Sequence, residues 1–268
     1  PSHLPLTRKN NLKGITMTAL FSLSNTTRIR EETSVLNKSG PSTKLGGFAA
    51  PQPRPLPVIV LADVSGSMAE NQKIEALNQA LQAMIESFAK ESRLRAEIQV
   101  GLITFGANGA KEHLPVVAAR RIESMETLQA SGATPMGQAL TMAQQWLEDK
   151  ERLPSRAYRP VLVLVSDGAP TDDWENPLKA LKASERAQKA TRFAMAIGAD
   201  ADTDMLAQFA NDREAPVFQA DGARDIVRFF RAVTMSVVTR SASTTPDQAQ
   251  TLRLTTDDLS DDLDLDNL

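Results

Sequence analysis

The chain has 268 residues, 41% of them hydrophobic and 24% charged, which suits one large folded domain with flexible extensions better than two full domains. It has no cysteine and only two histidines, His3 and His113, which excludes disulfides and thiolate metal sites and disfavours a zinc site or a histidine-based catalytic triad. No apolar run approaches the roughly 20 residues of a membrane span, and residues 17–23 are too short and polar for a signal peptide. We therefore expect a cytoplasmic protein without membrane contact.

The net charge of −3 hides a segregation of charge along the chain. Residues 1–50 carry seven Lys or Arg against two Glu, whereas residues 247–268 carry seven Asp against one Arg. Such blocks are typical of solvated segments. The basic block has few aromatic residues and no nucleic-acid motif, so nucleic-acid binding is not expected.

These patterns predict three regions. Residues 1–54 are a basic, Ser/Thr/Pro-rich arm and linker, in which alternate prolines from Pro51 to Pro57 favour an extended chain because each fixes φ and lacks a donor. Met17 is a candidate native start, which would place residues 1–16 outside the native protein. Residues 55–240 form the folded domain. Residues 241–268 form an acidic tail that is expected to be disordered, because its apolar content is low.

Strand and helix patterns alternate through the folded domain. Apolar runs predict strands at about 57–62, 98–105, 161–165, 193–197 and 217–218 and a short edge strand at 113–118, and helical periodicity predicts helices at 71–91, 136–150, 174–190, 202–211 and 225–238. In the first helix Ile74, Leu77, Leu81, Met84, Ile85 and Phe88 share one face. This order predicts an α/β fold with a doubly wound, mostly parallel central sheet, helices on both faces and one antiparallel edge strand.

The stretch Asp63-Val64-Ser65-Gly66-Ser67 follows the apolar run at 58–62. One carboxylate and two hydroxyls therefore emerge at the carboxyl end of a strand, the edge where open α/β sheets bind ligands. Oxygen ligands of this kind suit a hard divalent cation such as Mg²⁺. Taken alone, the same residues are better explained as a Ser/Gly turn whose Asp caps the next helix.

Two further residues are predicted at the same edge. Thr134 lies just before a predicted helix, as its N-cap with Pro135 in the first helical position, and Asp167 follows the central strand at 161–165. Each has a simpler interpretation, a helix cap for Thr134 and a turn for Asp167. Their joint convergence with the first motif favours a metal site made of Asp63, Ser65, Ser67, Thr134 and Asp167.

This arrangement resembles the von Willebrand factor A (vWA) domain and its metal-ion-dependent adhesion site (MIDAS), whose pattern is D-x-S-x-S, a distant Thr, and an Asp after a central strand. All five positions are present, and the resemblance covers about residues 55–240. It implies a Rossmann-like vWA fold and Mg²⁺, or Mn²⁺ or Ca²⁺, held directly by the hydroxyls and through water by the two carboxylates. It also implies a protein partner that presents an acidic residue to the metal.

Residues 57–68, 132–140, 165–174 and 229–237 further resemble bacterial TerY-like proteins, which are associated with tellurium resistance, stress responses and phage defence. Such proteins occur with a Ser/Thr protein kinase and a PP2C-type phosphatase, so the resemblance implies a non-enzymatic interaction module. One alternative is the accessory protein of a MoxR- or chelatase-type AAA+ ATPase. Another is a Mg²⁺-dependent phosphohydrolase using Asp63, although that chemistry wants a second Asp where Ser65 stands.

Overall fold

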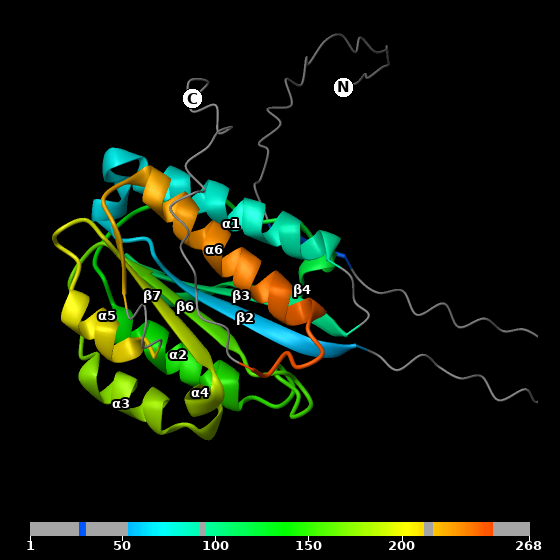
Figure 1. Cartoon of the computed structure of the whole chain (residues 1–268). Coiled ribbons are helices and arrows are strands. Elements are labelled where there is room, and N and C mark those ends of the chain that lie inside the picture. The colour runs from blue at the N-terminus through cyan, green and yellow to red at the C-terminus, as the bar shows by residue number, and fades with distance from the viewer. Residues whose placement is uncertain (1–26, 31–52, 92–94, 212–216, 249–268) are drawn as a thin grey trace, which may run out of the picture.

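The computed structural model describes residues 27–30, 53–91, 95–211 and 217–248 (Figure 1). Most of the predicted basic arm and the acidic tail from residue 249 onward lie outside the described residues, as do the predictions made for them.

A six-stranded sheet forms the centre of the domain, in the order β4-β3-β2-β6-β7-β8. Its strands are β2 (Arg54–Asp63), β3 (Ala96–Gly106), β4 (Gly109–Ala118), β6 (Val161–Ser166), β7 (Thr191–Ile197) and β8 (Phe218–Ala220). All neighbours are parallel except β3 and β4, which pair antiparallel at one edge. The predicted fold class is confirmed. Because β2 lies between β3 and β6, the chain reverses its direction of winding beside β2, and such reversals form ligand crevices at the carboxyl edge.

Helices cover both faces of this sheet (Figure 1). On one face lie α1 (Lys73–Lys90) and α6 (Ala223–Ala242), and on the other lie α2 (Met136–Glu148), α3 (Glu175–Ala183), α4 (Glu185–Lys189) and α5 (Thr203–Phe209). Residues of β2 alternate between the two cores, with Val58 and Val60 facing α1 and α6, and Ile59 and Leu61 facing α2. Burial on both faces explains why the central strands read as continuous apolar runs. Within the described segments, no helix combines the length and hydropathy needed to cross a bilayer.

Two of the linker prolines lie inside β2 rather than before it. Pro55 and Pro57 pair in register with β3, and the Pro55 carbonyl accepts a hydrogen bond from Tyr158 N at 2.8 Å. On that side β6 begins only at Val161, which pairs with Val58. The prolines are tolerated there because their missing N–H groups face no neighbouring strand.

The predicted helix at 174–190 is wrong as a single element, because it breaks at Ser184 into α3 and α4. Ser184 has extended backbone angles (φ −63°, ψ 129°), and its hydroxyl accepts a hydrogen bond from Ala187 N. A serine hydroxyl that caps a new helix competes with continuation of the old one. The helix predicted at 71–91 starts instead at Lys73, after the 3₁₀ segment η1 (Gly66–Gln72). The other predicted helices and strands are present, with shifted ends.

A small second sheet was not predicted. β1 (Arg28–Ile29) pairs antiparallel with β5 (Ile122–Ser124), which follows the 3₁₀ turn η2 (Ala119–Arg121). Arg30 N donates to Arg121 O at 2.7 Å, and Ile29 packs against the core beneath α1 and α6. Strands of two and three residues are too short to give a periodic signal, so the sequence did not reveal this contact of the N-terminal arm with the domain.

Candidate metal centre

Three loops meet at the carboxyl edge of the sheet, beside β2 and β6. The loop after β2 is hydrogen-bonded to the loop before α2 through Gly66 N to Gly132 O, at 2.9 Å, and Ser131 N to Val64 O, at 2.7 Å. The third loop follows β6 and begins at Asp167. Backbone contacts of this kind fix the loops relative to one another, so the side chains they carry are held in place before any ligand arrives.

Ser65, Ser67 and Asp167 form a tight group of oxygens. The Ser65 and Ser67 hydroxyls lie 3.1 Å apart, Ser67 donates to Asp167 Oδ1 at 2.7 Å, and Ser65 donates to the same oxygen at 3.5 Å. Oxygens that share an octahedral Mg²⁺ ion at 2.0–2.1 Å are separated by about 2.9 Å when adjacent. The two serine hydroxyls, 3.1 Å apart, lie close to this value, so the pair fits a small divalent cation.

Asp63 is fully buried at the end of β2. Its Oδ1 accepts a hydrogen bond from Ser65 N at 2.8 Å, and its Oδ2 accepts one from the Ser166 hydroxyl at 2.5 Å. Burial raises the pKa of the Asp63 carboxyl, an effect opposed by these hydrogen bonds and reinforced by the nearby charge of Asp167. Ion pairs of Asp63 are absent from the described part of the chain, so its negative charge is balanced there by dipoles alone.

Thr134 is buried on the loop before α2, with its hydroxyl beside Gly168. A β-carbon at Gly168 would lie 3.6 Å from Thr134 Oγ1, so Thr134 faces the residue that follows Asp167. The structure therefore places all five predicted site residues at one edge of the sheet. The predicted capping role of Thr134 is wrong, however: α2 begins at Met136 after Pro135, and no side chain of that loop caps it.

The cap of α2 comes instead from the loop after β6. Asp172 accepts hydrogen bonds from Gly137 N at 2.8 Å and from Gln138 N at 3.0 Å, and so satisfies two free donors of the first turn. Beside it, Thr171 N donates to Thr134 O at 2.9 Å, and Thr134 N donates to Thr171 Oγ1 at 3.1 Å. Thr171 and Asp172 therefore position Thr134, a role that the sequence analysis did not assign to them.

Replacing Asp172 with Ala is expected to reduce the free energy of unfolding by about 1–2 kcal/mol, because two donors at a helix terminus lose their acceptor. The cost should appear in urea denaturation of the metal-free chain. Glu175→Ala removes the same charge from an exposed position nearby and should cost less than about 0.5 kcal/mol. Equal losses in the two variants would contradict the capping role.

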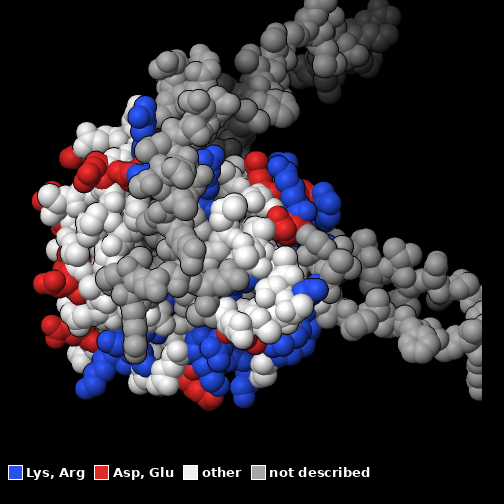
Figure 2. All heavy atoms as spheres, viewed as in Figure 1, with Lys and Arg blue, Asp and Glu red and all other residues white. Residues whose placement is uncertain are grey.

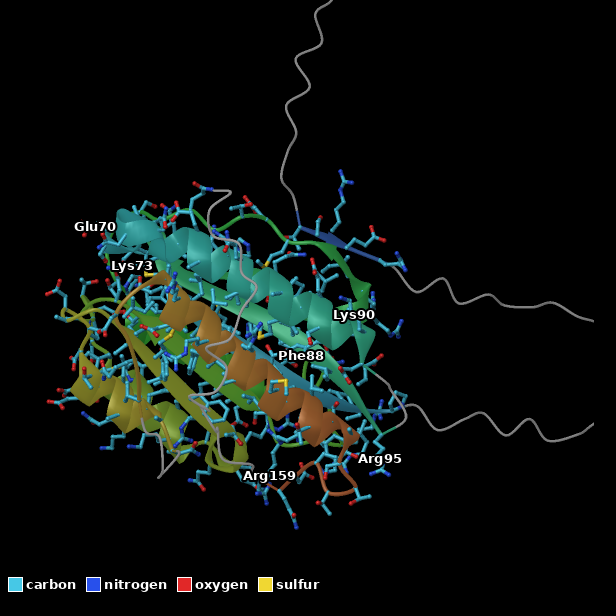
Figure 3. The ribbon with its side chains drawn as sticks, turned by 45° about the horizontal axis from the view of Figure 1, so that its top comes forward. Glu70, Lys73, Phe88, Lys90, Arg95 and Arg159 are labelled. Carbon is cyan, nitrogen blue, oxygen red and sulfur yellow. The ribbon has the colours of Figure 1, made fainter. Side chains whose placement is uncertain are left out.

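Lys73 also enters the site, although no motif pointed to it. Its Nζ lies 2.8 Å from Asp167 Oδ2, and the lysine and aspartate side chains are 13% and 0% exposed. The residue stands at the start of α1, near Glu70 of η1 (Figure 3). The charge of Asp167 is therefore paired within the chain, whereas that of Asp63 is not.

The donor set is hydroxyl-rich. No group of three or more His, Cys, Asp or Glu side chains suited to a metal ion occurs among the residues that the structure describes. Two carboxylates and three neutral hydroxyls are hard oxygen donors, which fit Mg²⁺ or Mn²⁺ better than a soft metal. The residues present therefore fit the divalent ion that the sequence resemblance implies.

Comparison with known proteins agrees with this fold. The family model for the von Willebrand factor type A domain matches residues 58–232. No curated protein matches the chain significantly.

Three solved structures illustrate the likeness. A von Willebrand factor type A protein from Catenulispora acidiphila has TM-score 0.54 and 20% identity over 69% of this chain and 42% of its own. The pilus adhesin SpaC from Lactobacillus rhamnosus GG, in its open conformation, has TM-score 0.56 and 15% identity, and the match covers 70% of this chain and 31% of SpaC. Proximal thread matrix protein 1 from the mussel byssus, with a zinc-occupied MIDAS motif, has TM-score 0.53 and 14% identity, and the match covers 70% of this chain and 48% of that protein. The chain spans less than half of each, and these identities establish a shared fold alone.

Proposed function

The chain belongs to the von Willebrand factor type A domain family, and we propose that it is a non-enzymatic protein-interaction module whose contact runs through a divalent cation. The metal ligands are Asp63, Ser65, Ser67, Thr134 and Asp167. The observation that carries the proposal is their meeting at the carboxyl edge of the sheet, where the hydroxyls of Ser65 and Ser67 lie 3.1 Å apart.

The chemical types of the metal-binding side chains explain how such a site binds a partner. Neutral hydroxyls donate little charge, so a bound divalent cation remains electrophilic and accepts a further oxygen ligand. An Asp or Glu of a partner protein supplies that ligand. Ser67 is exposed while Asp63 and Asp167 are buried, so access to the metal is from the Ser67 side. Mg²⁺ is the proposed ion, with Mn²⁺ and Ca²⁺ as alternatives.

The charge around the site restricts which partner segments can bind there. Acidic residues follow three of the strands at the carboxyl edge: Asp173 after β6, Asp200 and, in the first turn of α5, Asp204 after β7, and Asp221 after β8. Figure 2 shows acidic side chains along the left edge of the view, where the strands end in Figure 1. An acidic residue surrounded by other acidic residues would be repelled there, so the partner's metal ligand is proposed to lie among basic residues.

The geometry around Asp63 supports a binding role over a hydrolytic one. Both carboxylate oxygens of Asp63 already accept hydrogen bonds, and the side chain is fully buried. A nucleophilic aspartate would need an oxygen open to substrate. This geometry disfavours a hydrolase that uses Asp63 as its nucleophile, in keeping with the proposed non-enzymatic role.

The finer identity of the partner rests on the resemblance to TerY-like proteins. We propose a cytoplasmic role in tellurite, stress or phage-defence signalling, with a Ser/Thr kinase and a PP2C-type phosphatase as partners. An AAA+ ATPase of the MoxR or chelatase type is the alternative.

The proposal is tested by titrating Mg²⁺ and Mn²⁺ into the EDTA-treated full chain in a calorimeter, where one binding site is expected. Fluorescent peptides then probe the partner contact: a Glu flanked by lysines, its Gln counterpart, and the same Glu flanked by aspartates. The lysine-flanked Glu peptide should bind at least about tenfold more tightly than the other two, a difference of about 1.4 kcal/mol, and only with metal present, because the other two lack the metal ligand or the complementary charge. Absence of cation binding, or equal peptide binding in EDTA, would refute it.

A further inference from the structure

One cationic side chain of the protein enters the metal centre. Lys73 Nζ donates to Asp167 Oδ2 at 2.8 Å, while Asp167 Oδ1 accepts the hydroxyl of Ser67. The two ends of this ion pair are separated by 94 residues, and the aspartate is completely buried. A pair so well shielded from water is screened little by salt, so its influence on the site is strong.

The position of Lys73 is unfavourable for helix α1 itself. A positive charge in the first turn opposes the helix dipole, whereas Lys90 in the last turn is favourable. The chain before Lys73 is also strained, since Asn71 and Gln72 have φ values of 54° and 58°, which lie in the left-handed region. Consecutive non-glycine residues in this region are uncommon and tend to cluster at functional sites. The unfavourable charge position and the strained turn both cost stability. The contact between the Lys73 ammonium group and Asp167 is therefore not explained by stabilisation of α1.

Asp167 has two possible cationic neighbours. In the described structure the ammonium of Lys73 balances its charge, and in the proposed function a divalent cation does so. Both cations would be in reach of one carboxylate, and like charges at such short range repel strongly inside a protein. Each therefore weakens the binding of the other at Asp167.

Resting on the proposed function, we propose that Lys73 is an internal competitor of the metal, which lowers the affinity of the site for divalent cations and is displaced from Asp167 when the metal binds. The site then remains intact without metal, because Asp167 keeps a counter-charge. Binding becomes reversible at moderate metal concentrations rather than permanent. Displacement of the lysine also couples metal occupancy to the turn at Glu70–Gln72, which stands at the start of α1 (Figure 3).

The test measures the affinity of the full chain for Mg²⁺ and Mn²⁺ by calorimetry, and the metal-induced shift in melting temperature. Lys73→Met, which keeps the length and apolar stem of the side chain, is expected to bind the cation about tenfold more tightly than the original chain. Lys73→Arg retains the charge and should stay within about threefold of the original. Lys90→Met is the matched control, since it removes a positive charge from an exposed position on the same helix, about 25 Å away by helix rise. It should leave the affinity unchanged.

The outcomes separate this inference from the proposed function. If Lys73→Met binds metal more weakly or equally, the competitor role is overturned while the metal site stands, and weaker binding would make Lys73 a positioning residue for Asp167. If Lys73→Met and Lys90→Met gain affinity equally, the effect is one of net charge and the inference fails. If the original chain and both Lys73 variants bind no cation, the proposed function itself fails.

Discussion

Replacing Asp63 with Asn is expected to abolish stabilisation of the chain by divalent cations without weakening the metal-free fold. At a metal concentration 100 times the dissociation constant, a ligand that binds only the folded state adds about 2.7 kcal/mol to the free energy of unfolding. That gain should fall to nearly zero in Asp63→Asn, because one of the two carboxylates that balance the metal charge is lost. Thermal melting with Mg²⁺ and with EDTA measures the difference.

The metal-free part of this prediction follows from the pKa of Asp63. Burial raises this pKa, so the unfolded chain releases the proton more readily than the folded chain does. A carboxyl with a raised pKa in the folded state costs stability above its unfolded pKa of 3.8, and this cost is removed as the pH falls towards that value. Asn cannot ionise and can still accept from Ser65 N, so at neutral pH the EDTA-treated variant should melt at or above the temperature of the original chain.

The control is Asp204→Asn, which removes one exposed carboxylate from α5 at the same edge of the sheet. It should keep the full metal-induced shift in melting temperature. Loss of the shift in both variants would attribute the effect to the general acidity of this edge. A destabilised metal-free Asp63→Asn would mean that the negative charge of Asp63 is needed for folding, contrary to the burial argument.

The meeting of the five proposed metal ligands at one edge of the sheet was predictable because each is adjacent to a strong local signal. Asp63 and Asp167 directly follow apolar runs that read as central strands, and Thr134 precedes a helix with a clear apolar face. Once strand and helix alternate, the carboxyl ends of parallel strands must share one edge. Spacing within the chain was therefore enough to bring these residues together.

The residues that hold the ligands were not predictable in the same way. Asp172 caps a helix that starts 36 residues earlier, and Lys73 meets Asp167 across 94 residues. Neither contact leaves a periodic pattern, because each depends on how two loops are juxtaposed by the complete sheet. The cap of α2 was mispredicted for the same reason. The local sequence favoured Thr134 as the capping residue, but in the structure the carboxylate of Asp172, from a distant loop, accepts the hydrogen bonds of the first turn.

Element boundaries failed where side chains compete with the backbone. Helical periodicity runs through Ser184 without interruption, but the hydroxyl of that residue bonds to Ala187 N and starts a new helix. Pro55 and Pro57 suggested a linker because the sequence does not show that the neighbouring strand β6 begins late. At Ser184 a local side-chain contact overrides the helical period, whereas at Pro55 and Pro57 the tertiary context decides the outcome.

Replacing Gly137 with Ala is expected to destabilise the chain, although helix propensity alone predicts the opposite. Gly137 lies in the first turn of α2, where Ala is favoured over Gly by about 1 kcal/mol. However, a β-carbon at this position would lie 2.0 Å from Asp173 O and 2.8 Å from Asp173 C, which are backbone atoms. The loop after β6 would have to move away from α2, and overpacking of this kind typically costs about 1–3 kcal/mol.

Displacement of the loop after β6 should also disturb the position of Thr134 in the metal centre. Separating α2 from residues 172 and 173 weakens the bond from Gly137 N to Asp172 and loosens the two bonds between Thr134 and Thr171. Since these contacts position a proposed metal ligand, we expect Gly137→Ala to lose about tenfold in Mg²⁺ affinity as well as stability. Urea denaturation in EDTA and calorimetric titration of Mg²⁺ measure the two effects separately.

Gly222→Ala provides the matched control for this variant. Gly222 precedes α6 at the same edge of the sheet, has an extended backbone with φ −176°, and has open space where a β-carbon would stand. Its replacement should cost less than about 1 kcal/mol and leave metal affinity unchanged. If Gly137→Ala were instead as stable as the original chain, the gain in helix propensity would exceed the cost of the clash with Asp173. The packing of α2 against the loop after β6 would then be too loose to hold Thr134 in place.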